Sequence, residues 1–196
     1  MMHPDTQIVR VSELVGTGVI ARVAMPKGTL VWVRDPLDRT LSPAEVKALP
    51  QPVHDFSMTY MYRNCDGDFV LLWDHGKYVN HSFHPNCMPT PYGFDIAISD
   101  IAVGEELTED YGLLNIIEDF EPLVEGGAKD RKVVRGDDLR RHAQTWDLHL
   151  LDSVRAAKGL AQPLWSLLPK GVAHEIQEFW AERDTLRSVA SMLLRN

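Results

Sequence analysis

The stretch Asn80-His81-Ser82-Phe83-His84-Pro85-Asn86-Cys87 decides how this sequence is interpreted, together with Gly104-Glu105-Glu106-Leu107-Thr108-Glu109-Asp110-Tyr111-Gly112. Either string alone is weak evidence, because short motifs recur by chance. Two such strings in a fixed order along one chain seldom occur by chance. A third stretch, Gly16-Thr17-Gly18-Val19-Ile20-Ala21, places two glycines at the start of a β-rich segment. The three stretches are therefore interpreted together.

These stretches resemble the signature of SET-domain lysine methyltransferases, namely Asn-His-Ser with Pro-Asn, then Glu-Leu-Thr with Asp-Tyr, and an opening Gly-x-Gly strand. The resemblance covers about the first three-fifths of the chain. It implies an α+β fold: a β-rich, β-clip-like SET domain in which the Asn-His-Ser strand passes under a loop in a pseudoknot-like crossing. We expect this catalytic domain over residues 5–115, a linker over 116–136 and a helical segment over 137–196.

The resemblance also implies transfer of a methyl group from S-adenosyl-L-methionine to a lysine amine of a protein. Tyr111 matches the catalytic tyrosine of the family, and Asn80 and His81 match the residues beneath the cofactor. Tyr111 would also contact the cofactor. The remaining cofactor-binding candidates are the glycine-strand residues and two tyrosines: Gly16, Thr17, Gly18, Tyr60 and Tyr78.

Each candidate has a simpler structural interpretation. Gly-Thr-Gly at residues 16–18 is also typical of a tight turn. Tyr111 could be a strand-end tyrosine with its ring in the core, and His81 a core histidine. Tyr60, Tyr62 and Tyr78 could be ordinary sheet-packing residues. The flanking motif favours the functional interpretation for Tyr111 and for the Asn80-His81 pair.

The reaction makes a specific demand on the site. A free lysine amine has a pKa near 10.4, so at neutral pH it is almost entirely protonated and not nucleophilic. A narrow apolar channel next to a sulfonium charge disfavours the ammonium form. A phenol with a pKa near 10 is a poor base at pH 7. We therefore expect Tyr111 to position the amine rather than to remove its proton.

A metal site is not expected. His81, His84 and Cys87 recur at three-residue steps, but a structural zinc needs a fourth ligand and the chain has two cysteines. Many family members complete the lysine channel with a cysteine-rich zinc segment after the Asp-Tyr motif. No cysteine follows Cys87. Either the helical third supplies that wall or the site is open. The candidate lid aromatics of the helical third are Trp146, Trp165 and Phe179.

The composition narrows the partners. A formal net charge of −8 argues against direct nucleic-acid binding and favours basic partners, including a basic protein or a Lys-containing peptide as substrate. The first ten residues lack the apolar run of a signal peptide, and no stretch has membrane-spanning length. We therefore expect a reduced, cytoplasmic protein without membrane association. The sequence leaves the oligomeric state open.

The remaining pattern predicts the elements around these motifs. Alternating residues predict strands near 9–23, 29–33 and 94–98, and turn residues 64–68 predict a hairpin between 60–62 and 69–73. Ser42-Pro43-Ala44-Glu45 is a capping box for a short helix that Pro50 ends. Helical periodicity predicts one helix from Asp137 or Asp138 to Gly159. A second stripe runs from Val172 to Leu193 with Arg183 at its edge, and the two helices would form a hairpin packed on the β-rich part.

Two other functions remain open. A SET-like domain can bind cofactor or peptide without transferring a methyl group, although the presence of Tyr111 with Asn80 and His81 argues against this. Methylation of a non-protein amine is also possible, since a fold does not determine a substrate.

Overall fold

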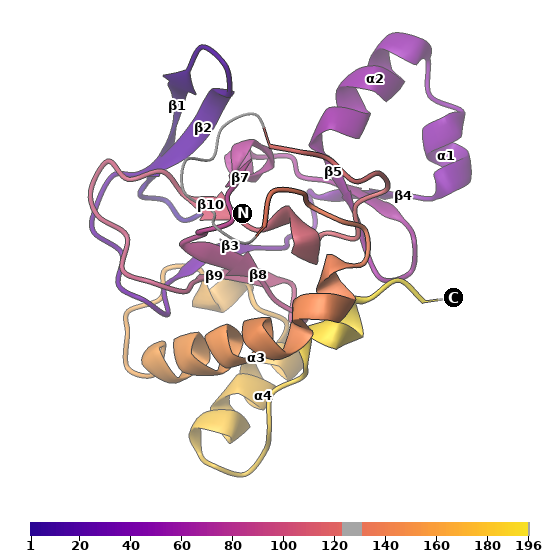
Figure 1. Ribbon diagram of the computed structural model, residues 1–196. Helices are drawn as coiled ribbons and strands as arrows, with labels where there is room; N and C mark the ends of the chain where they lie inside the picture. The colour runs from indigo at the N-terminus through magenta and orange to yellow at the C-terminus, as the bar shows by residue number, and fades with distance from the viewer. Residues whose placement is uncertain (123–130, 196) are drawn as a thin grey trace.

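The computed structural model describes residues 1–122 and 131–195, in which small β-sheets form the first part and helices the last part (Figure 1). The strands are β1 (Thr6–Ser12), β2 (Gly16–Ala21), β3 (Leu30–Val33), β4 (Arg39–Leu41), β5 (Met61–Arg63), β6 (Phe69–Leu71), β7 (Asn80–His81), β8 (Cys87–Pro89), β9 (Phe94–Ala97) and β10 (Thr108–Glu109). The α-helices are α1 (Pro43–Lys47), α2 (Gln51–Tyr60), α3 (Asp138–Ala156) and α4 (Lys170–Trp180). Short 3₁₀ turns are η1 (His75–Tyr78), η2 (Tyr111–Leu113), η3 (Trp165–Leu167) and η4 (Val189–Met192). The α+β class is confirmed.

The β1–β2 hairpin brings the glycine strand to the residues before β10. The two strands pair antiparallel, and Ile20 of β2 forms an isolated bridge with Glu106. Gly16 has φ +84°, a conformation that L side chains rarely adopt. In Figure 1 this hairpin projects on the side of the molecule away from α3 and α4. The glycine strand thus reaches the second signature string through its inner end.

The central sheet has the order β3-β9-β8 and separates two hydrophobic clusters. Side chains alternate across a strand, so Phe94 and Ile96 of β9 face the cluster that contains α3 and α4. Ala97 of β9 and Cys87 of β8 face the other cluster, which includes Val19 of β2. Asp95 lies between Phe94 and Ile96 and is therefore directed away from the helices.

The third sheet, β4-β6-β5, confirms the predicted hairpin between β5 and β6. The capping box at Ser42 is also present, with the Ser42 side chain accepting from Glu45 N–H and the Glu45 carboxylate accepting from Ser42 N–H. The sequence did not predict α2. Its only buried residue is Ser57, while Val53 and Phe56 are exposed, so it carries no clear apolar stripe.

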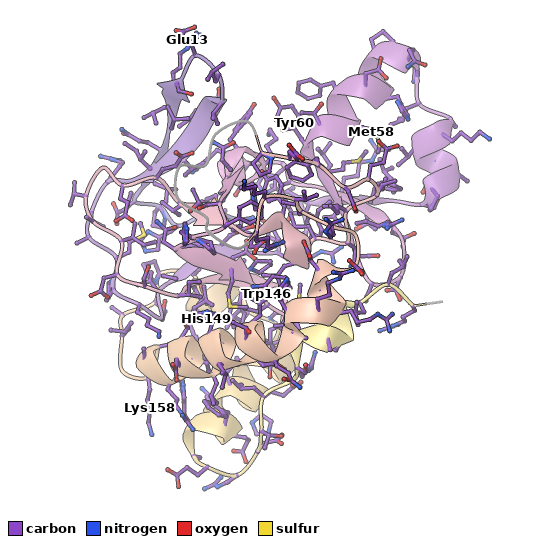
Figure 2. The ribbon with its side chains drawn as sticks, in the orientation of Figure 1. Glu13, Met58, Tyr60, Trp146, His149 and Lys158 are labelled. Carbon is purple, nitrogen blue, oxygen red and sulfur yellow. The ribbon has the colours of Figure 1, made fainter. Side chains whose placement is uncertain are left out.

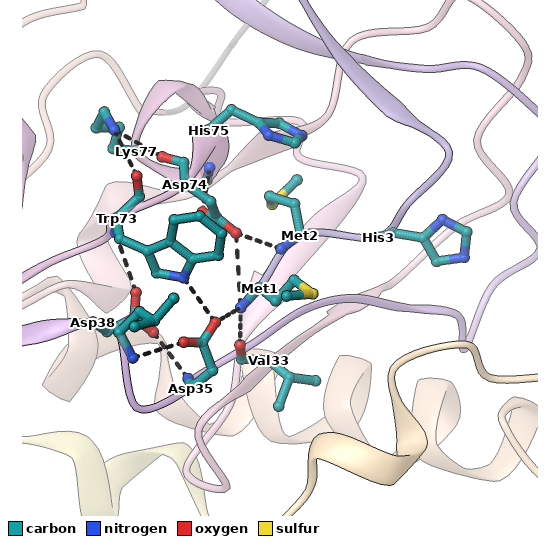
Figure 3. A network of polar contacts seen from close by, with 12 residues as sticks. Met1, Met2, His3, Val33, Asp35, Asp38, Trp73, Asp74, His75 and Lys77 are labelled. Carbon is teal, nitrogen blue, oxygen red and sulfur yellow. Dashed lines mark hydrogen bonds and ion pairs between the residues drawn. The ribbon is translucent and has the colours of Figure 1, made fainter.

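A polar network fixes the segment that leads into β7 (Figure 3). Trp73 Nε1 donates to Asp35 at 2.8 Å. Asp74 caps η1 by accepting from Gly76 N–H at 2.9 Å, and it also accepts from Met2 N–H at 2.6 Å. Since η1 ends two residues before Asn80, these contacts determine where the first signature string begins.

The two signature strings lie side by side because β7 and β10 pair in parallel, Asn80 with Thr108 and His81 with Glu109. The pairing continues past His81, since Ser82 N–H donates to Glu109 O at 2.9 Å. Residues far apart in the sequence are thereby held in register. The pseudoknot-like crossing expected for this region stays a prediction.

The helical part differs from the prediction in one respect. Helix α3 begins and ends as expected, but α4 ends at Trp180, so Leu186 to Leu193 do not continue it. Glu182 has φ 59°, which interrupts the helix before Arg183. Trp180 Nε1 donates to Val154 O at 2.7 Å, so α4 contacts α3, which in turn lies against β9 (Figure 1). Their arrangement as a helical hairpin stays a prediction.

The predicted linker, residues 116–136, is only partly visible, because 123–130 lie outside the described residues. Its two described ends meet: Phe120 and Val134 exchange backbone hydrogen bonds of 3.1 and 2.9 Å. Within residues 1–122 and 131–195, no helix has the length and apolar character needed to cross a bilayer.

Candidate active site

Asn80 joins the glycine strand to the second signature string. Its Nδ2 donates to Thr17 O at 3.0 Å and to Glu106 Oε1 at 2.7 Å. A Cβ on Gly18 would lie 2.9 Å from Asn80 Nδ2 and would collide with the Glu106 carboxylate. Gly18 is therefore needed for close approach, whereas Gly16 serves the turn. Gly16 thus fits the turn interpretation, and the cofactor-binding role of residues 16–18 stays a prediction.

Asn86, the last asparagine of the first string, has a role that the sequence did not predict. Its Nδ2 donates to Glu106 O at 2.8 Å, and its Oδ1 accepts from Thr108 N–H at 2.9 Å. One buried amide thus fixes the backbone on both sides of Leu107. The Pro-Asn part of the motif holds the two strings together.

His81 orients Tyr111. The Tyr111 N–H donates to His81 Nδ1 at 3.1 Å, and the two ring centroids are 5.4 Å apart. Phe83 and Phe120 contact the same imidazole ring, with centroids at 4.6 and 5.9 Å. Because Nδ1 accepts this hydrogen bond, the neutral ring carries its proton on Nε2. His81 therefore combines packing in an aromatic cluster with placement of the Tyr111 backbone.

The Tyr111 hydroxyl is fixed at its far end. It donates to Val79 O at 2.6 Å, while Asp110 accepts from Gly112 N–H at 2.9 Å and starts the turn η2. Burial raises the pKa of the Tyr111 phenol, so the group stays neutral throughout the physiological range. Since the hydroxyl proton is used at Val79 O, the oxygen is available as an acceptor for another donor.

Tyr111 lines a cavity of about 790 Å³. The cavity lies between the β5–β6 hairpin, the segment Leu113–Glu118 and the end of η4. Its lining includes the aromatic residues Trp32, Tyr60 and Tyr62, and the carboxylic acids Asp95, Glu109 and Glu118. Figure 2 places Tyr60 at the end of α2 that faces the middle of the molecule. The volume is that of a site for a ligand or for an inserted side chain.

The predicted site residues divide into two groups around Tyr111. Tyr60 and Tyr111 line the cavity. Tyr78 does not, but its ring packs edge-on against Tyr60 with centroids at 5.3 Å. The other predicted residues are held together outside the cavity lining, on the β2–β7–β10 side: Gly16, Thr17, Gly18, Asn80 and His81.

The helical third supplies part of the cavity wall, but through other residues than the three predicted aromatics. Arg187, Ser191 and Met192 line it. Trp146 is buried in the core on α3 (Figure 2), while Trp165 stacks on Trp180 with centroids at 5.3 Å. The prediction of Trp146, Trp165 and Phe179 as a lid is wrong, because their apolar faces are used to pack α3 and α4 on the sheet.

The sequence missed the carboxyl pair Asp95 and Glu109. Asp95 had a usable signal, since strand alternation places it on the opposite face from Phe94 and Ile96. Glu109 lies within the second signature string, but nothing in the string indicates that its side chain meets Asp95. Tyr62, considered only as a possible wall residue, does line the cavity next to them.

The His81, His84 and Cys87 spacing does not gather ligands. Cys87 is fully buried, and burial raises the pKa of its thiol, whereas His84 is exposed. In the part of the chain that the structure describes, no three side chains of His, Cys, Asp or Glu are grouped as metal ligands.

Comparison with known proteins agrees with this geometry. The family model described as SET domain matches residues 16–112. No curated protein matches the chain. Among solved structures, the chain is similar to a Plasmodium falciparum protein whose assignment as a histone methyltransferase is itself provisional, at 18% identity, covering 56% of this chain and 95% of that one, with a TM-score of 0.42. The family match runs from the first residue of β2 through both signature strings to the residue after Tyr111. Residues 16–112 of this chain therefore match the SET-domain family.

Proposed function

We propose that this protein is an S-adenosyl-L-methionine-dependent methyltransferase that methylates a lysine amine of a protein. The observation that carries the proposal is the position of Tyr111. Its hydroxyl is fixed on Val79 O at 2.6 Å, its backbone is fixed by His81, and its ring lines a cavity of about 790 Å³. A rigid neutral phenol at a cavity wall is suited to hold an incoming amine.

The Tyr111 oxygen acts by accepting. Because its own proton is donated to Val79 O, its lone pairs face other donors, and a substrate N–H can donate to it. That contact orients the amine nitrogen while its lone pair stays free for reaction. Burial keeps the phenol neutral, so Tyr111 does not act as the base.

The cofactor would supply an electrophilic methyl group on a sulfonium. We propose that Gly16, Thr17, Gly18, Asn80 and His81 hold it, with Tyr60, Tyr78 and Tyr111 on the cavity side. Asn80 supports this assignment, because its amide joins the glycine strand at Thr17 O to the Glu106 carboxylate. The Glu106 carboxylate beside Asn80 adds an acceptor for a cationic ligand. We propose no metal cofactor.

The partner we propose is a basic protein or a Lys-containing peptide, encountered in the cytoplasm without direct binding to nucleic acid or membrane. The net charge of −8 supports this choice, because it favours encounter with basic segments. The cavity accepts a single inserted side chain more readily than a folded surface, so the target lysine would lie on an exposed segment.

Two alternatives are retained. A SET-like module that binds without transfer would keep Asn80 and His81 but would not need the Tyr111 hydroxyl. Methylation of a non-protein amine would need the same chemistry with a different substrate.

Incubation with labelled cofactor and a panel of basic proteins and peptides, analysed by mass spectrometry, tests the proposal. Tyr111→Phe removes one oxygen and should lower the rate of transfer by about 10²-fold while cofactor affinity stays close to that of the wild type. Tyr92→Phe is the matched control, because the Tyr92 hydroxyl only accepts from Arg187 N–H at 2.8 Å. Equal loss of binding and rate in Tyr111→Phe would make this tyrosine structural. Cofactor binding with no transfer by the wild type would favour the binding module.

A further inference from the structure

Two carboxyl groups meet inside the cavity that Tyr111 lines. Asp95 comes from β9 and Glu109 from β10, and the two strands belong to different sheets. A side-chain hydrogen bond joins the two groups. Two ionised carboxylates have no proton to donate, so this contact requires that one of them be protonated. The pair therefore shares a proton, as like charges at close range require.

The pair is largely removed from solvent and faces the cavity. Glu109 is 7% exposed, and Asp95 is half-buried on the cavity side. Burial raises the pKa of Glu109 to about 7. Burial, and then the charge of Glu109, raise the pKa of Asp95 well above its ordinary value. None of the ion pairs within residues 1–122 and 131–195 includes either group.

The same cavity contains a polar group that points to a ligand. Trp32 is 3% exposed and lines the cavity, and its Nε1 has no hydrogen-bond partner among the described residues. Buried donors are normally paired. The other charged or titratable groups that act on the pair or on its neighbouring tyrosines come from several elements: Arg34, Asp38, Tyr62, Asp74, His81, Cys87, Glu106, Tyr111 and the Met1 amino group.

We propose that the Asp95–Glu109 pair receives the ammonium group of the substrate and takes up the proton that the amine loses before methylation. This inference rests on the proposed function. In the step, one N–H bond of the substrate ammonium breaks and its electron pair remains on nitrogen as the lone pair. The proton forms an O–H bond with the Glu109 carboxylate, and it later leaves to solvent through the open side of the cavity. Tyr111 holds the nitrogen, and the carboxyl pair supplies the base that the neutral phenol cannot.

The alternative is a structural one, in which the shared proton only ties β9 to β10. A purely structural pair would not respond to a cation in the cavity. A pair that receives an ammonium would, because a nearby positive charge stabilises the ionised carboxylate. The two interpretations therefore differ in a measurement that needs neither cofactor nor turnover.

The first test is a ¹³C NMR titration of the side-chain carboxyl groups with n-butylammonium, a mimic of the lysine side chain, and with neutral n-butanol. We expect n-butylammonium to lower the pH at which Glu109 titrates and n-butanol to leave it unchanged. Glu118 is the matched internal control, since its carboxyl also lines the cavity but is exposed. A Glu109 titration that does not respond to n-butylammonium overturns the inference.

The second test is the pH profile of methyl transfer on a substrate from the panel. Glu109→Gln should lower the rate at pH 7 by about 10²–10⁴-fold. The rate should return only as the pH approaches the pKa of the free amine, where the substrate loses its proton to solvent. Glu182→Gln changes an exposed carboxyl that does not line the cavity, so it should keep the wild-type profile. An unchanged profile in Glu109→Gln, or an equal loss at every pH, overturns the inference. Asp95→Asn gives the same comparison if Glu109→Gln does not fold. If the wild type transfers nothing, the proposed function fails while the NMR titration still decides this inference.

Discussion

At the scale of single residues, the amide of Asn80 determines how the glycine strand meets the second signature string. Two donors on one nitrogen serve two acceptors, Thr17 O and Glu106 Oε1. Neither contact depends on a ligand, so Asn80 both assembles the proposed cofactor site and contributes to it. The two roles can be separated, because stability and ligand response are measured independently.

Asn80→Ala should weaken the rise in melting temperature that S-adenosylhomocysteine produces, because a ligand selective for the native state stabilises it less when it binds less tightly. The same change should lower stability without ligand by about 1–3 kcal/mol, since it leaves Thr17 O and Glu106 without this donor. Ser42→Ala is a control, because it removes the α1 cap at a cost of about 1 kcal/mol without touching the site. Differential scanning fluorimetry measures both effects. No shift in the wild type at saturating ligand contradicts the cofactor assignment.

The raised pKa of Glu109 predicts how stability depends on pH. Folding raises this pKa from its ordinary value of 4.5 to about 7, so between these values the native state binds more protons than the unfolded state. Stability must then fall as pH rises through this window. Glu109→Gln removes the titrating group and should be more stable than the wild type at pH 8, by about 3 kcal/mol at most. Urea unfolding at pH 5 and pH 8 measures this. If the stability of Glu109→Gln depends on pH as strongly as that of the wild type, the assignment is contradicted.

The sequence identified Tyr111, Asn80 and His81 because each lies inside a recognisable string. It did not identify the Asp95–Glu109 pair, because the contact joins two sheets, and no spacing along the chain encodes which strands become neighbours. The prediction of a lid of aromatic residues was wrong for a related reason. Large apolar side chains on an amphipathic helix are used first to bury the helix, and Trp146 is 6% exposed.

At the scale of elements, Arg131 joins the end of β10 to the start of α3. Its guanidinium forms ion pairs with Asp110 and Asp138, whose side chains are 5% and 2% exposed. It also lies 4.7 Å from the centroid of the Phe83 ring. A Cβ on Gly112 would lie 2.6 Å from Arg131 Nη2, so glycine is needed next to Tyr111 for this approach. The arrangement links η2, the turn that contains Tyr111, to the helical part.

Arg131→Ala should destabilise the protein by about 3–5 kcal/mol, because it leaves two buried carboxylates without a partner. Arg135→Ala is the matched control: its ion pair with Asp119 at 3.3 Å is exposed, so it should cost only about 0–1 kcal/mol. Equilibrium unfolding in urea gives both values. Equal, small losses in the two variants would mean that Arg131 does not hold these elements together.

The elements that the sequence predicted well have strong local signals. Helix α3 has a stripe of buried residues from Leu139 to Val154, and Gly159 follows it at φ +85°. Helix α4 was predicted too long, because half-buried Leu186 and buried Val189 continue the apolar period although the backbone turns at Glu182. Burial pattern alone does not distinguish a continuous helix from a broken one.

At the scale of the whole molecule, one hydrophobic cluster crosses the predicted boundary between the β-rich and helical parts. It contains Leu30 and Phe94 from the central sheet together with Leu150 and Ile176 from α3 and α4. Gly28, at φ +92°, lies so close to the end of α3 that a Cβ there would be 2.5 Å from Ala157 N. The division into residues 5–115, 116–136 and 137–196 stays a prediction about sequence organisation. The packing favours a single cooperative unit.

Leu150→Ala tests this cooperativity. Leu150 is 1% exposed, and removing a buried leucine side chain costs about 2–5 kcal/mol. Leu148, two residues earlier on the same helix, is 64% exposed, so Leu148→Ala should have almost no effect. If the chain unfolds as one unit, Leu150→Ala lowers the urea midpoint by the same amount in two measurements. One is the circular dichroism of the helices, and the other is the resistance of the β1–β2 region to proteolysis. A shift in the circular dichroism alone would show that the helical part unfolds independently. The central sheet would then have to remain folded with Leu30 and Phe94 uncovered, which the packing of these two residues argues against.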